Sequence, residues 1–425
     1  NIPGAMALKV DPTVLADLAK KVNPVAVISG TNGKTTTTNL VADCLQTAGV
    51  PLYCNREGNN LQSGIVTSLM LAPDTSKVVD AASAAQAPVG CFECDEMYTK
   101  YVLPRLRPHY FMLLNLFRDQ LDRFGEIDRI QATIAEALAK TPETTFVFNG
   151  DDPLCAAIAD RIPNKSLAFG IASDMGLSAD RISDSRFCQK CGGALEYDYV
   201  HYGQLGAYRC PDCGWARPEL AFAATNVRLE EDGFVFDIDG RSVHTGHTGA
   251  YMVYNVLAAY AISTLSSIVP FENYQAAVRE YHPTNGRLQT FDLGKRKVMT
   301  NLAKNPTGFN QNIRIVLNER GRVLALFVND NDADGHDVSW FWDIDFERWS
   351  QIEGLRAFVG GTRANDMQVR LKYAGIQAEI VENVADVLAA TGADDGKVYI
   401  IANYTALPAV RRELEGLEAA AKGEE

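Results

Sequence analysis

The sequence predicts an α/β protein with a doubly wound domain that contains a phosphate-binding loop, an inserted cysteine module and a second, Rossmann-like α/β domain. Three observations lead to this fold class. An apolar segment runs into a glycine-bracketed turn within residues 25–38, two pairs of cysteines follow in mid-chain, and apolar runs alternate with amphipathic segments. A chain of 425 residues is also too long for one hydrophobic core, so two or three domains are expected.

The turn after the first predicted strand has the chemistry of a phosphate-binding loop. Backbone N–H groups from Gly30 to Gly33 can converge on a polyphosphate, Lys34 can reach the β- and γ-oxygens, and the Thr35 hydroxyl can ligate Mg²⁺. The alternative is an ordinary glycine turn with a surface lysine, because Ile28 occupies the place of the first glycine of the strict loop. The expected nucleotide contacts are Gly30, Thr31, Asn32, Gly33, Lys34, Thr35 and Thr36.

Composition and charge narrow the class of protein. The formal net charge is −13 and no cluster of lysine and arginine is present, which argues against nucleic acid as the main partner. No segment approaches the roughly 18 apolar residues of a membrane span, and no signal peptide is expected before the first strand. The nine cysteines then fit a reducing compartment, so we expect a cytoplasmic enzyme without a transmembrane segment.

The first 290 residues alternate strands and helices as in a doubly wound sheet. Strands are expected at 25–29, 89–94, 110–115 and 145–149, and helices at 35–48, 127–140 and 153–161. Polar residues follow several of these strands, where ligands collect in such folds, and we expect them to surround one nucleotide. Glu93 ends a buried apolar strand and is best explained as a Mg²⁺ ligand, whereas Asp152 before Pro153 is better explained as a helix N-cap.

Four cysteines have the spacing of a structural zinc ribbon within residues 183–218. Cys188 and Cys191 form one C-x₂-C knuckle, Cys210 and Cys213 form the other, and 18 residues separate the pairs. A closed site of four thiolates leaves no position for water, so the Zn²⁺ is expected to be architectural. The other five cysteines are expected to be small buried hydrophobic residues without a redox role.

The last third of the chain predicts a separate Rossmann-like domain after a linker near 283–292. Its strands are expected at 322–328, 356–359, 377–381 and 397–401, and its helices at 364–374, 383–391 and 405–417. The predicted domains are therefore 1–290, with the zinc ribbon inserted, and 291–425.

Five motifs together resemble the Mur ligase superfamily in order and spacing. They are Gly30-Thr-Asn-Gly-Lys-Thr35, Asn115 with Asp119-Gln-Leu-Asp122-Arg123, Asn149-Gly-Asp151-Asp152-Pro153, Tyr254-Asn255-Val-Leu-Ala258-Ala259 and Asn285-Gly286-Arg287. The short sequence before the phosphate loop, the inserted cysteines and the run from Asp334 to Asp343 are similar to one branch, the synthetase subunits of lipid II isoglutaminyl synthases.

This resemblance implies an activity, cofactors and a partner. ATP and Mg²⁺ would drive amidation of the α-carboxylate of D-glutamate in the lipid II stem peptide, with ammonia from a GatD-type glutamine amidotransferase subunit. Lys34 and Arg287 would act on the phosphates, Asn255 and Arg287 would contact the nucleotide, and Thr35 and Glu93 would hold Mg²⁺. Asp337, or alternatively Asp334, would complete the glutaminase triad of the partner.

Some positions depart from ordinary Mur ligases and keep other functions open. Gln120, Tyr254 and Lys304 replace histidines of the family pattern, so the amino-acid-binding residues cannot be carried over. The alternatives are a free-standing Mur-type amino-acid ligase and a zinc-ribbon module whose binding or regulation depends on a nucleoside triphosphate.

Overall fold

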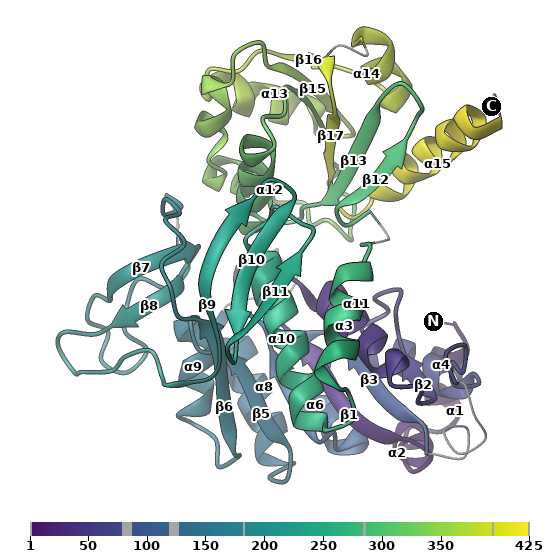
Figure 1. The fold of residues 1–425 in the computed structure, drawn as a ribbon, viewed down its shortest axis with the longest axis vertical. Helices are drawn as coiled ribbons and strands as arrows, with labels where there is room; N and C mark the ends of the chain where they lie inside the picture. The colour runs from purple at the N-terminus through teal and green to yellow at the C-terminus, as the bar shows by residue number, and fades with distance from the viewer. Residues whose placement is uncertain are drawn as a thin grey trace. The chain divides into compact units, whose positions relative to one another are not determined.

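The computed structural model describes residues 2–78, 87–118, 127–181, 183–283, 286–392 and 395–423. The chain divides into two compact units, each built around its own sheet (Figure 1). The first unit comprises the described residues up to 118, with 127–179 and 183–281, and the second comprises 180–181 and the described residues from 282 onward.

The first unit contains a nine-stranded sheet in the order β11-β10-β9-β6-β5-β4-β1-β3-β2. The strands from β9 to β2 in this order are parallel, and β10 and β11 extend the sheet antiparallel. Their bounds are β1 Asn23–Ser29, β2 Leu52–Cys54, β3 Val89–Glu93, β4 Tyr110–Leu113, β5 Thr145–Asn149, β6 Ser166–Ile171, β9 Leu220–Glu230, β10 Gly233–Ile238 and β11 Arg241–Thr245.

Strand β1 lies in the interior of this sheet, between β3 and β4. Val25, Ala26, Val27 and Ile28 are all buried, as expected for a parallel strand that is covered on both faces. The chain order reverses at β1, since later strands lie on both sides of it, and ligands bind at such a switch point in open α/β sheets.

Helices cover both faces of the first sheet. The helix bounds are α1 Ile2–Val10, α2 Val14–Ala19, α3 Lys34–Thr47, α4 Gln62–Met70, the 3₁₀ turn η1 Glu96–Tyr98, α6 Thr99–Leu106, α8 Ile127–Ala139, α9 Pro153–Ala159, α10 Tyr251–Ser266 and α11 Phe271–Glu280. Helices α3, α10 and α11 pack on one another (Figure 1). Helices α6, α8 and α9 share a hydrophobic core with Val27, Phe111 and Phe146 of the sheet.

The predicted ribbon is a separate two-stranded antiparallel sheet of β7 Glu196–Tyr202 and β8 Leu205–Arg209. Strand β7 is exposed where it begins, at Glu196. The end of the hairpin, residues 202–205, is instead almost fully buried in the first unit. We call residues 202–205 the hairpin tip. A tight turn through Gly203, which has φ of +56°, joins the two strands.

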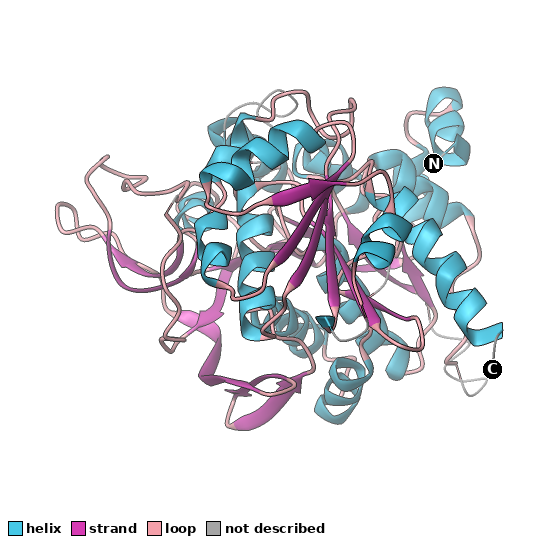
Figure 2. Cartoon of the chain, turned by 90° about the horizontal axis from the view of Figure 1, so that it is seen from above, coloured by secondary structure: helices cyan, strands magenta, loops and turns pink. Residues whose placement is uncertain are grey.

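The second unit has a six-stranded sheet in the order β12-β13-β17-β14-β15-β16, parallel except for the β12–β13 pair. Its elements are β12 Gln289–Asp292, β13 Lys297–Leu302, α12 Pro306–Asn318, β14 Val323–Phe327, η2 Ser339–Asp343, η3 Phe346–Gln351, β15 Arg356–Gly360, α13 Ala364–Tyr373, β16 Ala378–Ile380, α14 Val384–Ala390, β17 Val398–Ala402 and α15 Leu407–Gly423. Helices flank the strands in Figure 2. Val323, Ala325 and Phe327 alternate toward the core that α14 and α15 complete.

Candidate nucleotide-binding and metal sites

The predicted phosphate loop links β1 to α3, and this strand–turn–helix order confirms the prediction from the sequence. Gly33 caps the helix with φ of +88°, and a Cβ atom there would lie 2.5 Å from Oδ1 of Asn255. Gly30 has φ of +135°, and its Cβ would lie 3.0–3.1 Å from Leu114 and Asn115. Neither position can accept a side chain without moving its neighbours, so both glycines are fixed by conformation and by space.

The loop is held by residues 115–117, which follow β4 and which we call the strap. The N–H of Thr31 donates to the Asn115 carbonyl at 3.0 Å, and the N–H of Asn32 donates to Asn115 Oδ1 at 2.9 Å. In return, Nδ2 of Asn115 donates to the Asn32 carbonyl at 3.0 Å. These two N–H groups therefore fix the loop to the strap, and we expect the phosphate-binding donors at Gly33, Lys34 and Thr35, at the start of α3.

Lys34 is buried beside the loop that it serves. Its Nζ lies 2.5 Å from the Gly30 carbonyl oxygen and 3.3 Å from Oε2 of Glu96. Glu96 lies three residues after the end of β3 and belongs to the polar strand ends that were expected to surround a nucleotide. Thr36 is buried in the first turn of α3.

Thr35 and Glu93 meet at the mouth of α3, as a shared magnesium site requires. The Thr35 hydroxyl donates to Glu93 Oε2 at 2.6 Å, and Asn60 Nδ2 donates to the other carboxylate oxygen at 3.0 Å. Asn55 holds the Glu93 backbone by bonds to both its N–H and its carbonyl. A hydroxyl and a carboxylate are the hard oxygen donors that Mg²⁺ prefers, so this donor set fits the ion. Asn55 and Asn60 were not predicted, and the polar turn after β2 was the available signal.

Asn255 and Arg287 have different surroundings. Asn255 lies on α10 with Oδ1 directed at the loop, 3.3 Å from the hydroxyl of Thr37. Arg287 lies in the second unit, after the Gly286 turn with φ of +71°, and its contact with a nucleotide stays a prediction. The motif residues Asp119, Gln120, Asp122, Arg123 and Asn285 lie outside the described residues.

The acidic residues after β5 face the protein interior. Asp152 caps α9 by accepting the Leu154 N–H at 3.0 Å, which confirms the predicted N-cap. Its other oxygen accepts the Leu116 N–H of the strap at 2.8 Å, and burial raises its pKa to about 6. Asp151 is also fully buried and bound by protein groups, so both residues support the sheet edge rather than facing a nucleotide.

A buried polar network connects Asp151 to the ribbon. Arg217 pairs with Asp151 Oδ1 at 3.0 Å, and the Tyr254 hydroxyl lies 2.7 Å from both Asp151 Oδ2 and His201 Nδ1. His201 Nε2 donates to the Ser173 carbonyl at 3.0 Å. Burial lowers the pKa of His201 and raises the pKa of Asp151, because it disfavours both charges.

The four predicted zinc ligands converge. The Sγ atoms of Cys188, Cys191, Cys210 and Cys213 all lie within 4.8 Å of one another. The Cys188–Cys213 and Cys191–Cys210 distances are 3.6 and 3.5 Å, far longer than a disulfide bond and close to the edge of a tetrahedral thiolate site. Gly192 and Gly214, with φ of +78° and +75°, turn the backbone after each knuckle. The donor set fits a structural Zn²⁺.

Four of the five remaining cysteines confirm the prediction of buried thiols. Cys44, Cys91, Cys94 and Cys155 are buried, whereas Cys54 is partly exposed. Burial raises the pKa values of Cys91 and Cys94 well above the ordinary range, which disfavours the reactive thiolate.

Asp337 lies in an exposed turn of the second unit. Its Oδ1 accepts the Ser339 N–H at 2.8 Å, and this bond lowers its pKa. Asp334, the alternative residue, is buried and accepts both the N–H and the hydroxyl of Thr405. Trp340 packs on Phe309, with ring centroids 5.5 Å apart.

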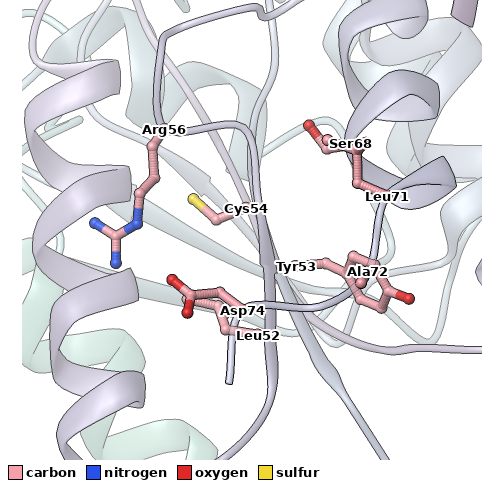
Figure 3. Close-up of a pocket in the computed structure, with 8 residues that line it drawn as sticks. All are labelled: Leu52, Tyr53, Cys54, Arg56, Ser68, Leu71, Ala72 and Asp74. Carbon is pink, nitrogen blue, oxygen red and sulfur yellow. The ribbon is translucent and has the colours of Figure 1, made fainter. Parts of the chain in front are cut away.

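A pocket of about 110 Å³ lies beside β2 (Figure 3). Arg56 and Asp74 are on one side of it and Tyr53 and Ala72 on the other. The Arg56 guanidinium is paired with Asp43 at 2.8 Å and also donates to Gln46, so its charge is already matched. The lining residues are Leu52, Tyr53, Cys54, Arg56, Ser68, Leu71, Ala72 and Asp74.

Within the described part of the chain, we find no helix with the length and apolar character that crossing a membrane demands. A strand, a glycine-rich turn and a helix that opens with Lys34 and Thr35, at the switch point of a parallel sheet, define a nucleotide-binding protein of the phosphate-loop class.

Comparison with known proteins places the chain within that class. The Mur ligase middle domain family matches residues 28–263, and the MurT ligase C-terminal family matches residues 302–407. The lipid II isoglutaminyl synthase (glutamine-hydrolyzing) subunit MurT of Staphylococcus aureus (strain N315) is 32% identical over 419 residues, which cover 97% of this chain and 92% of that protein. The subunit of the same name from Streptococcus pneumoniae (strain ATCC BAA-255 / R6) is 34% identical over 415 residues, or 96% and 90% of the two chains.

Among solved structures, a pseudomurein peptide ligase type C from Methanothermus fervidus shares the fold. Its TM-score is 0.68 at 18% identity, over 94% of this chain and 80% of that one. The chain belongs to the MurT family of Mur ligases.

Proposed function

We propose that this chain is the ATP-dependent synthetase of a lipid II isoglutaminyl synthase. It would convert the α-carboxylate of D-glutamate in the lipid II stem peptide into the amide of D-isoglutamine. The observation that carries the proposal is the likeness to the staphylococcal MurT subunit over 97% of the chain. The contact of Thr35 with Glu93 beside a buried Lys34 supports it, because phosphoryl transfer needs charge held at that place.

A carboxylate must be activated before ammonia can attack its carbon, because its negative charge disfavours attack by a nucleophile. Transfer of the γ-phosphoryl group to a carboxylate oxygen gives an acyl phosphate and ADP, and ammonia then adds to the carbonyl carbon. Phosphate leaves, the added nitrogen loses a proton, and the amide remains. When bound, Mg²⁺ would neutralise phosphate charge, and Thr35 and Glu93 would hold it. Lys34 and Arg287 would stabilise the charge that develops on the transferred group.

The ammonia would come from a GatD-type glutaminase partner. Free ammonia is mostly protonated at neutral pH and then lacks a lone pair, so a coupled glutaminase can supply the reactive form. We propose that Asp337 completes the triad of that partner, where a carboxylate would orient the histidine. Its exposure and its lowered pKa support this role, because the side chain is accessible and ionised at neutral pH.

The proposal is tested with the purified chain, a glutaminase partner, lipid II, ATP and glutamine. Mass spectrometry of the product should show conversion of one carboxylate to an amide, with one phosphate released for each amide. Lys34→Ala should lower turnover by roughly 10²-fold, as expected from loss of one preorganised electrostatic donor. Lys20→Ala is the control, since that lysine is exposed and pairs with Asp17.

Other outcomes point to other functions. Product formed from a free amino acid without glutamine or ammonium would identify an amino-acid ligase and overturn the proposal. Nucleotide binding without any amidation in the complete mixture would favour the other alternative, a zinc-ribbon binding or regulatory module.

A further inference from the structure

The phosphate loop is supported by a stack of three layers. Thr31 and Asn32 of the loop form the inner layer, and the strap at residues 115–117 forms the middle one. Besides its bonds to Asn115, the loop is joined to the strap through Thr31 Oγ1, which accepts the Phe117 N–H at 2.9 Å and lies 3.2 Å from the Phe117 carbonyl. A displacement of Phe117 must therefore reach the loop.

The ribbon supplies the outer layer of this stack. Gln204 of the hairpin tip donates from Nε2 to the Leu116 carbonyl at 2.7 Å, and Asp152 accepts the Leu116 N–H at 2.8 Å. Both backbone polar groups of Leu116, the central strap residue, are thus satisfied from outside the loop. The Tyr202 ring stacks on Phe117, with centroids 6.1 Å apart.

The hairpin, through His201 and Tyr202, also contacts Tyr254 of α10, the helix that borders the loop. His201 contacts the Tyr254 hydroxyl, and the Tyr202 ring packs edge-on against Tyr254 at 5.8 Å. The next residue on α10 is Asn255, whose Oδ1 lies 3.3 Å from the Thr37 hydroxyl and against Gly33. The hairpin thus contacts both the strap and the helix that border the phosphate loop.

We propose that the hairpin tip positions the phosphate loop, with Gln204 as a positioning residue, so that folding of the four-cysteine module controls nucleotide affinity. The tip is suited to this because Tyr202, Gln204 and Leu205 are at most 3% exposed. Gly203 allows the close approach, since a Cβ there would lie 2.6 Å from the Phe117 ring. The inference rests on nucleotide binding by the loop, as in the proposed function, and adds the ribbon to that site.

The test compares two buried glutamines that make the same kind of bond. Gln204→Met removes the donor to the Leu116 carbonyl and keeps the volume of the side chain. Gln131→Met is the matched control, because Gln131 is equally buried and its Nε2 donates at the same 2.7 Å to the Leu154 carbonyl, which is not a group of the strap. Binding of Mg·ADP is measured by calorimetry on the full chain, well below the unfolding midpoint of each variant.

We expect both variants to lose thermal stability, and only Gln204→Met to bind Mg·ADP more weakly, by roughly tenfold, which is about the effect of one hydrogen bond. In the complex with its glutaminase partner, the KM for ATP should rise while the KM for glutamine stays unchanged. Gly203→Ala provides a second variant, since its methyl group would push on Phe117. Equal Mg·ADP affinities for wild type, Gln204→Met and Gly203→Ala would overturn the proposal.

A metal experiment tests the same coupling without mutation. Stripping the wild-type chain with a chelator should weaken Mg·ADP binding, and adding Zn²⁺ alone should restore it. Unchanged affinity in the stripped protein would contradict the inference. If untreated wild type does not bind Mg·ADP at all, the proposed function itself fails, which is a separate result.

Discussion

The Thr35 hydroxyl donates a 2.6 Å hydrogen bond to Oε2 of Glu93, 58 residues further along the chain. The parallel register that pairs Ile28 of β1 with Glu93 of β3 brings the two together. Glu93 is held from its other side by Asn55 and Asn60, so its carboxylate is oriented before any ligand binds. This pair is the geometric reason to expect a cation at the start of α3.

Glu93→Gln should therefore weaken Mg²⁺ binding while keeping the shape of the side chain. We expect the Mg²⁺ concentration for half-maximal ATP turnover to rise, and turnover at saturation to fall by roughly 10²-fold, because one anionic ligand is lost. Glu57→Gln is the control, since Glu57 is an exposed carboxylate in the turn after β2. An unchanged Mg²⁺ dependence in Glu93→Gln would remove Glu93 from the metal site.

Much of this architecture follows from local patterns in the sequence. Buried parallel strands such as residues 25–29 are continuous apolar runs, and every predicted strand and helix is present, with ends within two residues except at the last helix. The four cysteines were predictable as a group because metal chemistry fixes their spacing.

The contacts that support the loop were less predictable, because they join residues far apart in the chain. Gln204 meets Leu116 across 88 positions, and Asp151 meets Tyr254 across 103. No periodicity predicts either pairing, and the motifs that contain Asp151 and Tyr254 do not indicate that these two residues meet. The acidic residues after β5 were predicted to surround the nucleotide because they are polar residues at a strand end. The prediction did not take account of burial, and Asp152 is buried and supports the strap.

Metal removal should destabilise the ribbon. Structural zinc sites of this kind supply on the order of 10 kcal/mol to their own module, so Cys210→Ser should unfold β7 and β8. Elemental analysis should find one zinc per chain in the wild type and much less in the variant. Cys54→Ser should keep the metal, because that thiol lies outside the cluster. Less than one metal per chain in protein purified without chelators would contradict the assignment.

Stability should fall on mild acidification because of His201. Burial lowers the pKa of His201, so below the ordinary histidine pKa of about 6.5 the unfolded chain takes up a proton that the folded chain resists. This contribution is fully present above pH 6.5 and is lost as the pH falls toward the folded value. Asp151, whose pKa is raised by burial, acts in the opposite direction. The other titratable groups near His201 are Asp174, Tyr199, Arg217 and Tyr254.

Urea unfolding at pH 7.5 and 5.5 measures this effect. The loss of unfolding free energy between the two values should be smaller in His201→Gln than in the wild type. His109→Gln should behave like the wild type, because His109 is exposed. An identical pH dependence in the wild type and His201→Gln would show that the protonation of His201 does not change on folding.

The last prediction concerns Asp337, for which the second unit offers a clear choice between two carboxylates. Asp334 is buried and its carboxylate accepts hydrogen bonds from Thr405, so replacing Asp334 should disrupt the loop in which it lies. Asp337 is exposed and bonded only locally in its own turn, through Ser339. If Asp337 completes the glutaminase triad of the partner, Asp337→Asn should lower glutamine hydrolysis by roughly 10²-fold or more, because the histidine loses its orienting carboxylate.

Three measurements on the purified complex separate this role from a structural one. Glutamine hydrolysis should fall in Asp337→Asn, amidation driven by added ammonium should stay at the wild-type rate, and the subunits should still co-purify. Asp332→Asn is the matched control, since Asp332 is an exposed carboxylate of the same loop that pairs with His336. Wild-type glutamine hydrolysis in an intact Asp337→Asn complex would exclude Asp337 from the triad, whereas loss of hydrolysis and ammonium-driven amidation together would indicate a damaged subunit.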